Sequence, residues 1–236
     1  MSPEAGRFWY DRRSMSTARA VHAFLPLLLS AVVACGGGAP SEAPPSEVPT
    51  SVEAAPPADP LAADAGAARI DGMALPARGM VRSIIALEPH AELDVPVSEE
   101  MPVIDQYGRL FIPDFVMVQA GQTVRFTNSE DDLHTVHVKD EAGESLINVA
   151  TINGSRYDFL VEEPGEYVVI CNTHTEMFAD ILAFDTPYFV MAEADGSFSL
   201  EGVVPGTYTA VVLYGGERTE REVELVAGPN QLDLAG

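Results

Sequence analysis

Hydrophobic and polar positions alternate over short stretches of the chain from residue 69 onward, which is the pattern of half-buried β-strands. In residues 123–128, TVRFTN, Val124 and Phe126 alternate with polar neighbours, and residues 134–139, HTVHVK, resume the alternation after a polar loop. Glycine and proline separate the stretches, and no helical period of any length appears between them. The pattern therefore predicts an all-β protein, a sandwich or a barrel.

Further strands are expected where β-branched and aromatic residues lie between turn signals. The expected strands cover residues 69–73, 80–87, 104–117 with a turn at Tyr107 and Gly108, 156–161, 188–192, 198–200, 207–214 and 222–226, and residues 166–184 contain two β-rich runs that flank a short loop. The assignment of residues 146–152 stays open. Pro113 is expected to mark an edge strand or a bulge, and Thr186 and Pro187 mark a boundary to a second β pattern.

A positively charged segment and an apolar run open the chain. Residues 20–34 form an apolar run that follows Arg12, Arg13 and Arg19, which is the organisation of a secretory signal. The run is too short for a comfortable transmembrane span. Residues 1–34 are therefore expected to be a signal peptide, whose start at Met1 or at Met15 stays open.

The apolar run ends in the letters VVAC followed by GGG, which resembles the lipobox of bacterial lipoproteins. The resemblance implies cleavage before Cys35 and lipid on its sulfur, with two or more acyl chains as a firm anchor. Residues 35–68 are rich in Ala, Pro, Ser and Glu, so this segment is expected to be a disordered tether. The expected location is the bacterial cell envelope, facing the periplasm, and Gly36 is compatible with the outer membrane. The alternative is an ordinary signal peptide with a chance cysteine.

The chain contains two cysteines, Cys35 and Cys171. If Cys35 carries lipid, Cys171 has no intramolecular partner and is a lone thiol in an oxidising compartment. Such a cysteine is buried and inert, paired to another chain, or a metal ligand.

The loop within residues 166–184, EYVVICNTHTEMFADILAF, contains the candidate chemistry. It offers the thiolate of Cys171, the imidazole of His174 and the thioether of Met177 within seven residues, a ligand set soft enough for copper in both oxidation states. Copper that cycles between these states is served by two imidazoles, a thiolate and a weak axial thioether, so one more histidine must come from elsewhere. The alternative is that Cys171 is a small buried side chain and Met177 fills a gap in the core.

The letters FTNSEDDLH and CNTHTEM resemble the cupredoxin family of blue-copper proteins, whose pattern is F-x-N, a histidine after a loop, and then Cys, His and Met. The Cys-x-x-His-x-x-Met spacing is similar to that of the amicyanins. The resemblance covers residues 101–185 and implies a Greek-key β-sandwich with one type 1 copper ion. The implied ligands are His134, Cys171, His174 and Met177.

Two further residues are expected to support this site, Asn128 of the F-x-N pattern and Thr135. Many cupredoxins have Asn after the first histidine, where it ties the two ligand loops. The hydroxyl of Thr135 is expected to make one such hydrogen bond but not the full amide set. The rigidity and the redox potential of the site therefore stay open, whereas metal binding is less affected.

His137 needs a separate interpretation. On a strand, His134 and Val136 share one face while Thr135 and His137 point the other way. His137 is therefore expected at the surface. The alternative is that a bulge turns it into the site, or that it helps to bind a second ion.

Residues 194–213, ADGSFSLEGVVPGTYTAVVL, resemble the carboxypeptidase-regulatory or transthyretin-like family, whose recurrent sequence motifs are D-G-x-F and P-G-x-Y. Residues 186–236 are short for this prealbumin-like sandwich. The strands within residues 69–100 look like its missing first strands. The resemblance therefore implies a small sandwich built from both ends of the chain, with the cupredoxin inserted into it or packed against it.

The charge of the chain limits the classes of molecule that are expected to bind it. The sequence has 13 lysine and arginine residues against 36 aspartate and glutamate residues, a formal net charge of −23 at pH 7. Such a field disfavours nucleic acid and anionic lipid surfaces, and it would steer a cationic redox protein such as a cytochrome c toward the chain. The alternative is that the acidity only maintains solubility.

The expected function is electron transfer without a small-molecule substrate, through the exposed edge of His174 as in the family. Counting histidines disfavours a copper enzyme. Once His134 and His174 are used, His90 and His137 remain in the mature chain, too few for an additional three-histidine centre. The alternative function is a copper carrier or storage module without a dedicated redox partner, although Met177 is the only thioether in the motif.

Overall fold

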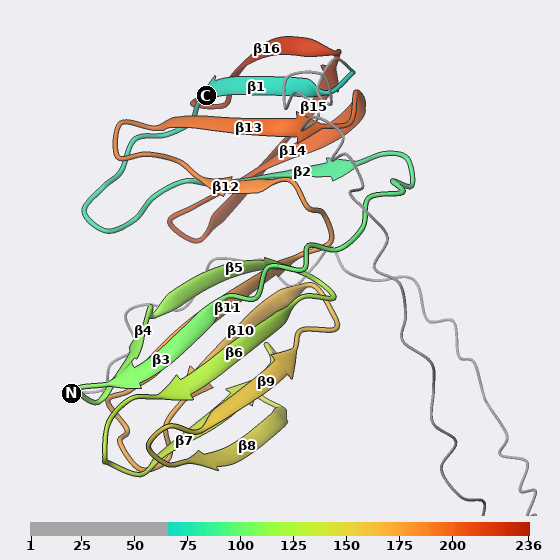
Figure 1. The fold of residues 1–236 in the computed structure, drawn as a ribbon. Coiled ribbons are helices and arrows are strands. Elements are labelled where there is room, and N and C mark those ends of the chain that lie inside the picture. The colour runs from blue at the N-terminus through green and yellow to red at the C-terminus, as the bar shows by residue number, and fades with distance from the viewer. Residues whose placement is uncertain (1–65) are drawn as a thin grey trace, which may run out of the picture.

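The computed structural model describes residues 66–236, which form sixteen strands in four sheets and no helix (Figure 1). The all-β class expected from the alternation is confirmed. The described residues contain no helix that is long and apolar enough to cross a membrane. The signal peptide expected at residues 1–34, the lipidated Cys35 and the tether up to residue 65 lie outside the described residues.

Two sheets form the sandwich that contains the candidate ligands. Their strand orders are β5-β11-β10-β7-β8 and β4-β3-β6-β9. The strands are β3 (Val103–Tyr107), β4 (Leu110–Ile112), β5 (Phe115–Gln119), β6 (Thr123–Asn128), β7 (His134–Lys139), β8 (Ser145–Thr151), β9 (Arg156–Leu160), β10 (Gly165–Ile170) and β11 (Phe178–Phe184). β6 and β7 have the bounds that the alternation predicts, β8 settles the open assignment of residues 146–152, and Pro113 lies between β4 and β5.

The core of this first sandwich consists of the side chains that alternate toward its interior. Val124 and Phe126 of β6 face Val136 and Val138 of β7, and all four are 0% exposed. The same cluster contains Cys171 and Met177, so the predicted ligand loop begins and ends in the core.

The other two sheets form a second sandwich from both ends of the described chain. Their orders are β13-β1-β16 and β12-β2-β14-β15. The strands are β1 (Ala68–Met73), β2 (Ile84–Pro89), β12 (Phe189–Met191), β13 (Ser197–Val203), β14 (Gly206–Tyr214), β15 (Glu217–Leu225) and β16 (Gly228–Asp233). β1 pairs antiparallel with β13 and parallel with β16, and β2 pairs antiparallel with β12 and β14.

The two sandwiches pack against each other through a third apolar cluster. The outward faces of β5 and β11 meet the outward faces of β2, β12 and β14 (Figure 1). Phe184 of β11 stacks on Phe189 of β12, with ring centroids 4.7 Å apart. β11 is therefore buried on both faces: Ile181 belongs to the core of the first sandwich, whereas Leu182 and Phe184 belong to the contact between the sandwiches.

We expect Phe184→Ala to lower the free energy of unfolding by about 3 kcal/mol, because it removes a buried ring from the contact between the sandwiches. Chemical denaturation followed by circular dichroism measures the change. The control is Phe178→Ala on the same strand. The side chain of Phe178 is 60% exposed, so its removal should lower the free energy of unfolding by about 0.5 kcal/mol. Equal losses in the two variants would contradict the packing assigned to Phe184.

Candidate metal centre

Two neighbouring strands bring the candidate ligands together. His134 is the first residue of β7, and Cys171 directly follows the last residue of β10. β7 and β10 are antiparallel, with His137 opposite Ile170, so the residue after β10 lies beside the start of β7. The loop that follows returns to β11, which pairs with β10.

Backbone hydrogen bonds close the loop between Cys171 and Met177. The N–H of Cys171 donates to the carbonyl oxygen of Met177 over 3.3 Å, and the N–H of Met177 donates to the carbonyl oxygen of His174 over 3.0 Å. The loop is therefore a tight turn that holds His174 over the end of the sandwich.

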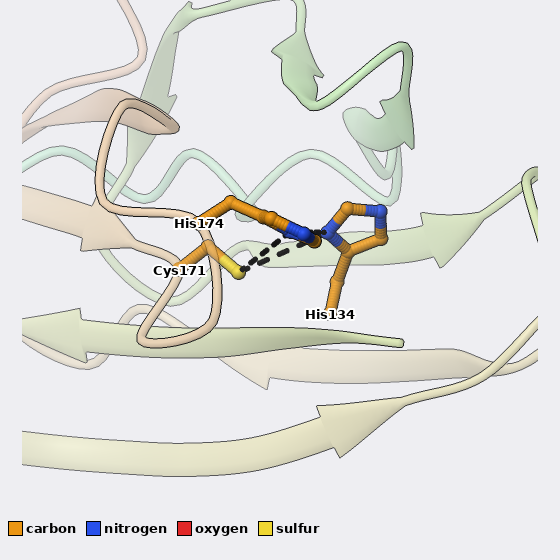
Figure 2. Close-up of side chains that lie close together, drawn as sticks. All are labelled: His134, Cys171 and His174. Atoms are coloured by element: carbon orange, nitrogen blue, oxygen red, sulfur yellow. Dashed lines mark hydrogen bonds between the residues drawn. The ribbon is translucent and has the colours of Figure 1, made fainter. Parts of the chain in front are cut away.

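The side chains of His134, Cys171 and His174 point toward one another (Figure 2). The Sγ atom of Cys171 lies 3.8 Å from Nδ1 of His134 and 4.0 Å from Nδ1 of His174. The two Nδ1 atoms are 3.0 Å apart. His134 and Cys171 are buried, at 0% and 2% exposed, whereas His174 is half-buried.

These separations fit a single metal ion. A point equidistant from the three atoms lies about 2.1 Å from each, which matches bond lengths of about 2.0 Å to imidazole nitrogen and about 2.3 Å to thiolate sulfur. One sulfur and two imidazole nitrogens also form a donor set that soft and borderline transition metals prefer over hard ions. The residues therefore fit a bound transition metal.

Met177 lies at the end of the same loop and is 1% exposed. It packs in the apolar cluster that contains Cys171. Its thioether is thus held in the dry part of the sandwich behind the loop. The structure brings together the three stronger predicted ligands directly, and Met177, the fourth predicted ligand, lies at the buried end of the same loop.

Hydrogen bonds favour the thiolate form of Cys171. Burial raises the pKa of this thiol, but the N–H of Thr135, the imidazole of His134 and the N–H of His174 act in the opposite direction. Together with the Thr135 hydroxyl they lower the pKa from 9.0 to about 6. The sulfur therefore carries the negative charge that metal binding requires.

Thr135 links the two segments that carry the ligands. Its N–H lies 3.4 Å and its hydroxyl oxygen 3.7 Å from Sγ of Cys171. The hydroxyl also accepts a hydrogen bond from the N–H of Asn172 over 2.6 Å. This hydroxyl makes a hydrogen bond that ties the two ligand segments together. It can accept one and donate another, because a hydroxyl has both lone pairs and a proton.

Asn128 shapes the loop that precedes His134. Its amide nitrogen donates to the carbonyl oxygens of Asp132 and Thr151, and its amide oxygen accepts from the N–H of Glu130. Asn128 is 1% exposed, and none of these hydrogen bonds reaches a ligand atom. It therefore supports the site by fixing the loop between β6 and β7.

Glu130 is a residue of the site that the sequence reasoning missed. Its Oε1 atom lies 2.6 Å from Nε2 of His134, on the side of the ring away from the other ligands. Burial raises the pKa of this carboxyl, but the N–H groups of Arg109 and Gly108 and the His134 ring lower it overall. The available signal was an acidic residue four positions before a predicted ligand, in the letters SEDDLH.

His137 lies on the opposite face of β7 from His134, as expected. Its Nδ1 atom is 3.1 Å from the amide oxygen of Asn172, and its Nε2 atom is 3.0 Å from the hydroxyl of Ser145. It is not one of the three side chains that converge. The alternative in which a bulge turns His137 into the site is wrong, because β7 pairs regularly with β8 at this position.

No family model matches this chain, and no curated protein matches it. Several solved structures match part of the chain. A purple cupredoxin from Nitrosopumilus maritimus matches with 21% identity and a TM-score of 0.32, covering 35% of this chain and 99% of its own. Amicyanin from Paracoccus versutus matches with 23% identity and a TM-score of 0.34, covering 42% of this chain and 97% of its own.

A copper-containing nitrite reductase from Thermus scotoductus matches with 26% identity and a TM-score of 0.35. The match covers 42% of this chain but 26% of the reductase. The structural neighbours thus include cupredoxins, each matched over less than half of this chain.

We expect one equivalent of Zn(II) to stabilise the protein by about 2.7 kcal/mol when the free ion is at a hundred times its dissociation constant. Zinc tests the donor geometry without redox chemistry. Thermal unfolding with and without the ion measures the effect. Cys171→Ala should abolish the stabilisation, and His137→Ala should retain it, since His137 lies outside the ligand group. A loss in His137→Ala alone would contradict the assignment.

Proposed function

We propose that this protein binds one type 1 copper ion and carries single electrons between redox partners. The observation that carries the proposal is the convergence of one thiolate and two imidazoles with ligand atoms 3.0 to 4.0 Å apart. Two histidines, one cysteine and a weak axial thioether form the ligand set of blue-copper electron-transfer sites. His134, Cys171 and His174 would hold the ion, with Met177 as the axial ligand.

Copper, when bound, would supply the one-electron couple, and the chain would supply a fixed set of donors. The loop hydrogen bonds and the contacts of Thr135 hold Cys171 and His174 before any metal arrives. A preformed ligand set limits rearrangement between the two oxidation states. The same rigidity argues against a carrier that must release its metal readily.

The half-buried His174 offers the route for electrons to the surface. The other imidazole, His134, is 0% exposed. Two apolar side chains next to ligands in the sequence reach solvent, Leu133 at 51% and Phe178 at 60% exposed. We infer that a partner docks over this end of the sandwich and exchanges electrons through the edge of the His174 ring.

The proposal extends to the location of the protein. Cys35 would carry the lipid anchor, and the segment after it would tether the two sandwiches to a membrane of the bacterial envelope, on the periplasmic side and in the outer membrane. The second sandwich would be a transthyretin-like domain that supports the copper domain. The partner would be a cationic redox protein such as a cytochrome c, because the chain has a formal net charge of −23.

We expect Cu(II) to produce an intense visible band from charge transfer between the Cys171 thiolate and the metal. Absorption spectroscopy during titration with Cu(II) measures the band and its stoichiometry of one ion per chain. Cys171→Ser should remove the band, and His90→Ala should leave it, since His90 hydrogen-bonds Thr209 in the second sandwich. A band that survives Cys171→Ser would refute the site.

We expect the rate of electron exchange with a cationic cytochrome c to fall roughly tenfold or more between low salt and about 0.15 M ionic strength, because salt screens the acidic surface. Stopped-flow absorption measures the rate. Reduction by uncharged hydroquinone is the control and should change little. If the cytochrome rate is equally indifferent to salt, the cationic partner is the wrong proposal, although the copper site is untouched by that result.

A further inference from the structure

The strand β8 has one side that no described strand covers. It is the last strand of the five-stranded sheet and pairs with β7 alone. Figure 1 shows it on the side of the first sandwich that lies away from the second sandwich. Its pairing with β7 is regular from Ile147 to Thr151, and the one irregularity lies at the start of β8. Such an edge presents a row of backbone N–H and C=O groups that can pair with another strand.

The sequence of β8 lacks the charges that usually protect an edge strand. No residue from 145 to 155 is charged, although 21% of the residues in the chain are. By contrast, β15 is an edge strand of the second sandwich and reads ERTEREVEL, with six charged residues among nine. Charged side chains on an edge oppose pairing with a second chain. The edge of β15 is therefore protected, whereas the edge of β8 is not.

The apolar side chains of β8 are incompletely covered. Ile147 and Val149 pack against the core of the first sandwich but stay half-buried. Leu146 and Ile152, at the two ends of the strand, are 44% and 65% exposed. A further strand beside β8 would remove part of this apolar surface from water, which is favourable. The open edge thus offers both backbone hydrogen bonds and apolar contact.

We propose that the open edge of β8 is a docking surface for a second copy of this chain. The two β8 strands pair antiparallel about a two-fold axis, with Asn148 opposite Asn148 of the partner subunit. Asn148 is the midpoint of β8, so this register pairs the strand over its whole length. The contact joins the two five-stranded sheets into one continuous sheet.

The register brings side chains of the same kind together. Antiparallel pairing about Asn148 places Ile147 beside Val149 of the partner subunit, on the side of the sheet that faces the core. A two-fold contact is self-complementary, so this apolar pair forms twice. Cross-strand pairs of this kind are the units that stabilise a sheet. Each copy therefore extends the apolar core of the other at the point where that core is half-exposed.

Charges at the two ends of β8 favour a second copy as the occupant. Asp140, Glu141 and Glu144 precede the strand, and Arg156 follows it after an uncharged turn. Antiparallel pairing brings the acidic start of one copy toward the Arg156 end of the other, so opposite charges meet at both ends of the contact. The formal net charge of −23 makes two copies repel in general. A contact between copies therefore requires an uncharged strand with opposite charges at its ends, and β8 has both.

The contact leaves the metal centres accessible. Within each copy His134 is paired with Thr151, so the metal centre lies near the end of β8. In an antiparallel pair the two Thr151 ends point away from each other. The second sandwiches lie at the opposite edges of the joined sheet, beyond β5. The inference is therefore independent of the metal that the site binds.

Sedimentation velocity of the full chain over a concentration series measures the association. We expect the wild type to change from monomer to dimer as its concentration rises. Asn148→Lys should raise the dissociation constant about fivefold or more, because it places two like charges opposite each other at the centre of the contact. Thr219→Lys is the matched control. It adds the same charge at an exposed position of β15 and should leave the dissociation constant unchanged.

Disulfide cross-linking tests the register. Residues directly opposite in an antiparallel pair have Cα atoms about 4.5 to 5.5 Å apart, within the range of about 4.4 to 6.8 Å that a disulfide requires. Mild oxidation should therefore link Asn148→Cys into a covalent dimer. Ala150→Cys is the control on the same face of the same strand, because its two copies lie four residues apart along the sheet, about 13 Å. The wild type, which contains Cys35 and Cys171, reports any linkage through those thiols.

A chain that is monomeric at every concentration would overturn the proposal and leave this edge to a different protein. Association of equal strength in Asn148→Lys and the wild type would overturn it as well, since the contact would then lie elsewhere. Cross-linking of Asn148→Cys no stronger than that of Ala150→Cys would refute the register.

Discussion

The antiparallel pairing of β7 with β10 is the constraint on which the candidate metal centre depends. It brings Cys171, the residue that follows β10, to the end of β7 that begins with His134. A shift of one residue in a strand turns every side chain to the opposite face. The apolar side chains Val136, Val138 and Val169 prevent such a shift, because all three are 0% exposed and would be moved toward solvent. The packing of the core thus fixes the geometry of the ligands.

A metal site in an apolar sandwich also requires that every buried polar group has a partner. His134 satisfies this requirement through Glu130, and Cys171 through Thr135. These partners belong to the segments on either side of the first ligand, which keeps the arrangement local along the chain. The partner of Glu130 on its other side comes from a distant hairpin, so the ligand is tied to both sheets of the sandwich.

The sequence predicts the strands best where one face is buried and the other is half-exposed. The alternation in TVRFTN and HTVHVK locates β6 and β7 with their observed bounds. It does not predict β16, whose side chains are exposed or half-exposed throughout, and it predicts only the end of β15, where Val223 and Leu225 are buried. At the site, ligand spacing is visible in the sequence, but the choice of Glu130 among three neighbouring acidic residues is not. That choice depends on the turn between β3 and β4, which only the packing of the folded chain brings close to Glu130.

Strands buried on both faces explain how the second sandwich is attached without covering the metal centre. Continuous apolar runs such as ILAF in β11 and AVVL in β14 indicate strands, and the structure adds that each supplies two different clusters. The contact uses Phe184 at the end of β11, whereas the ligand loop precedes Phe178 at its start. Six residues of extended strand separate these points by about 20 Å. Since the described chain enters through β1 of the second sandwich, an anchor before β1 would join the molecule on that side and leave the His174 end open to a partner.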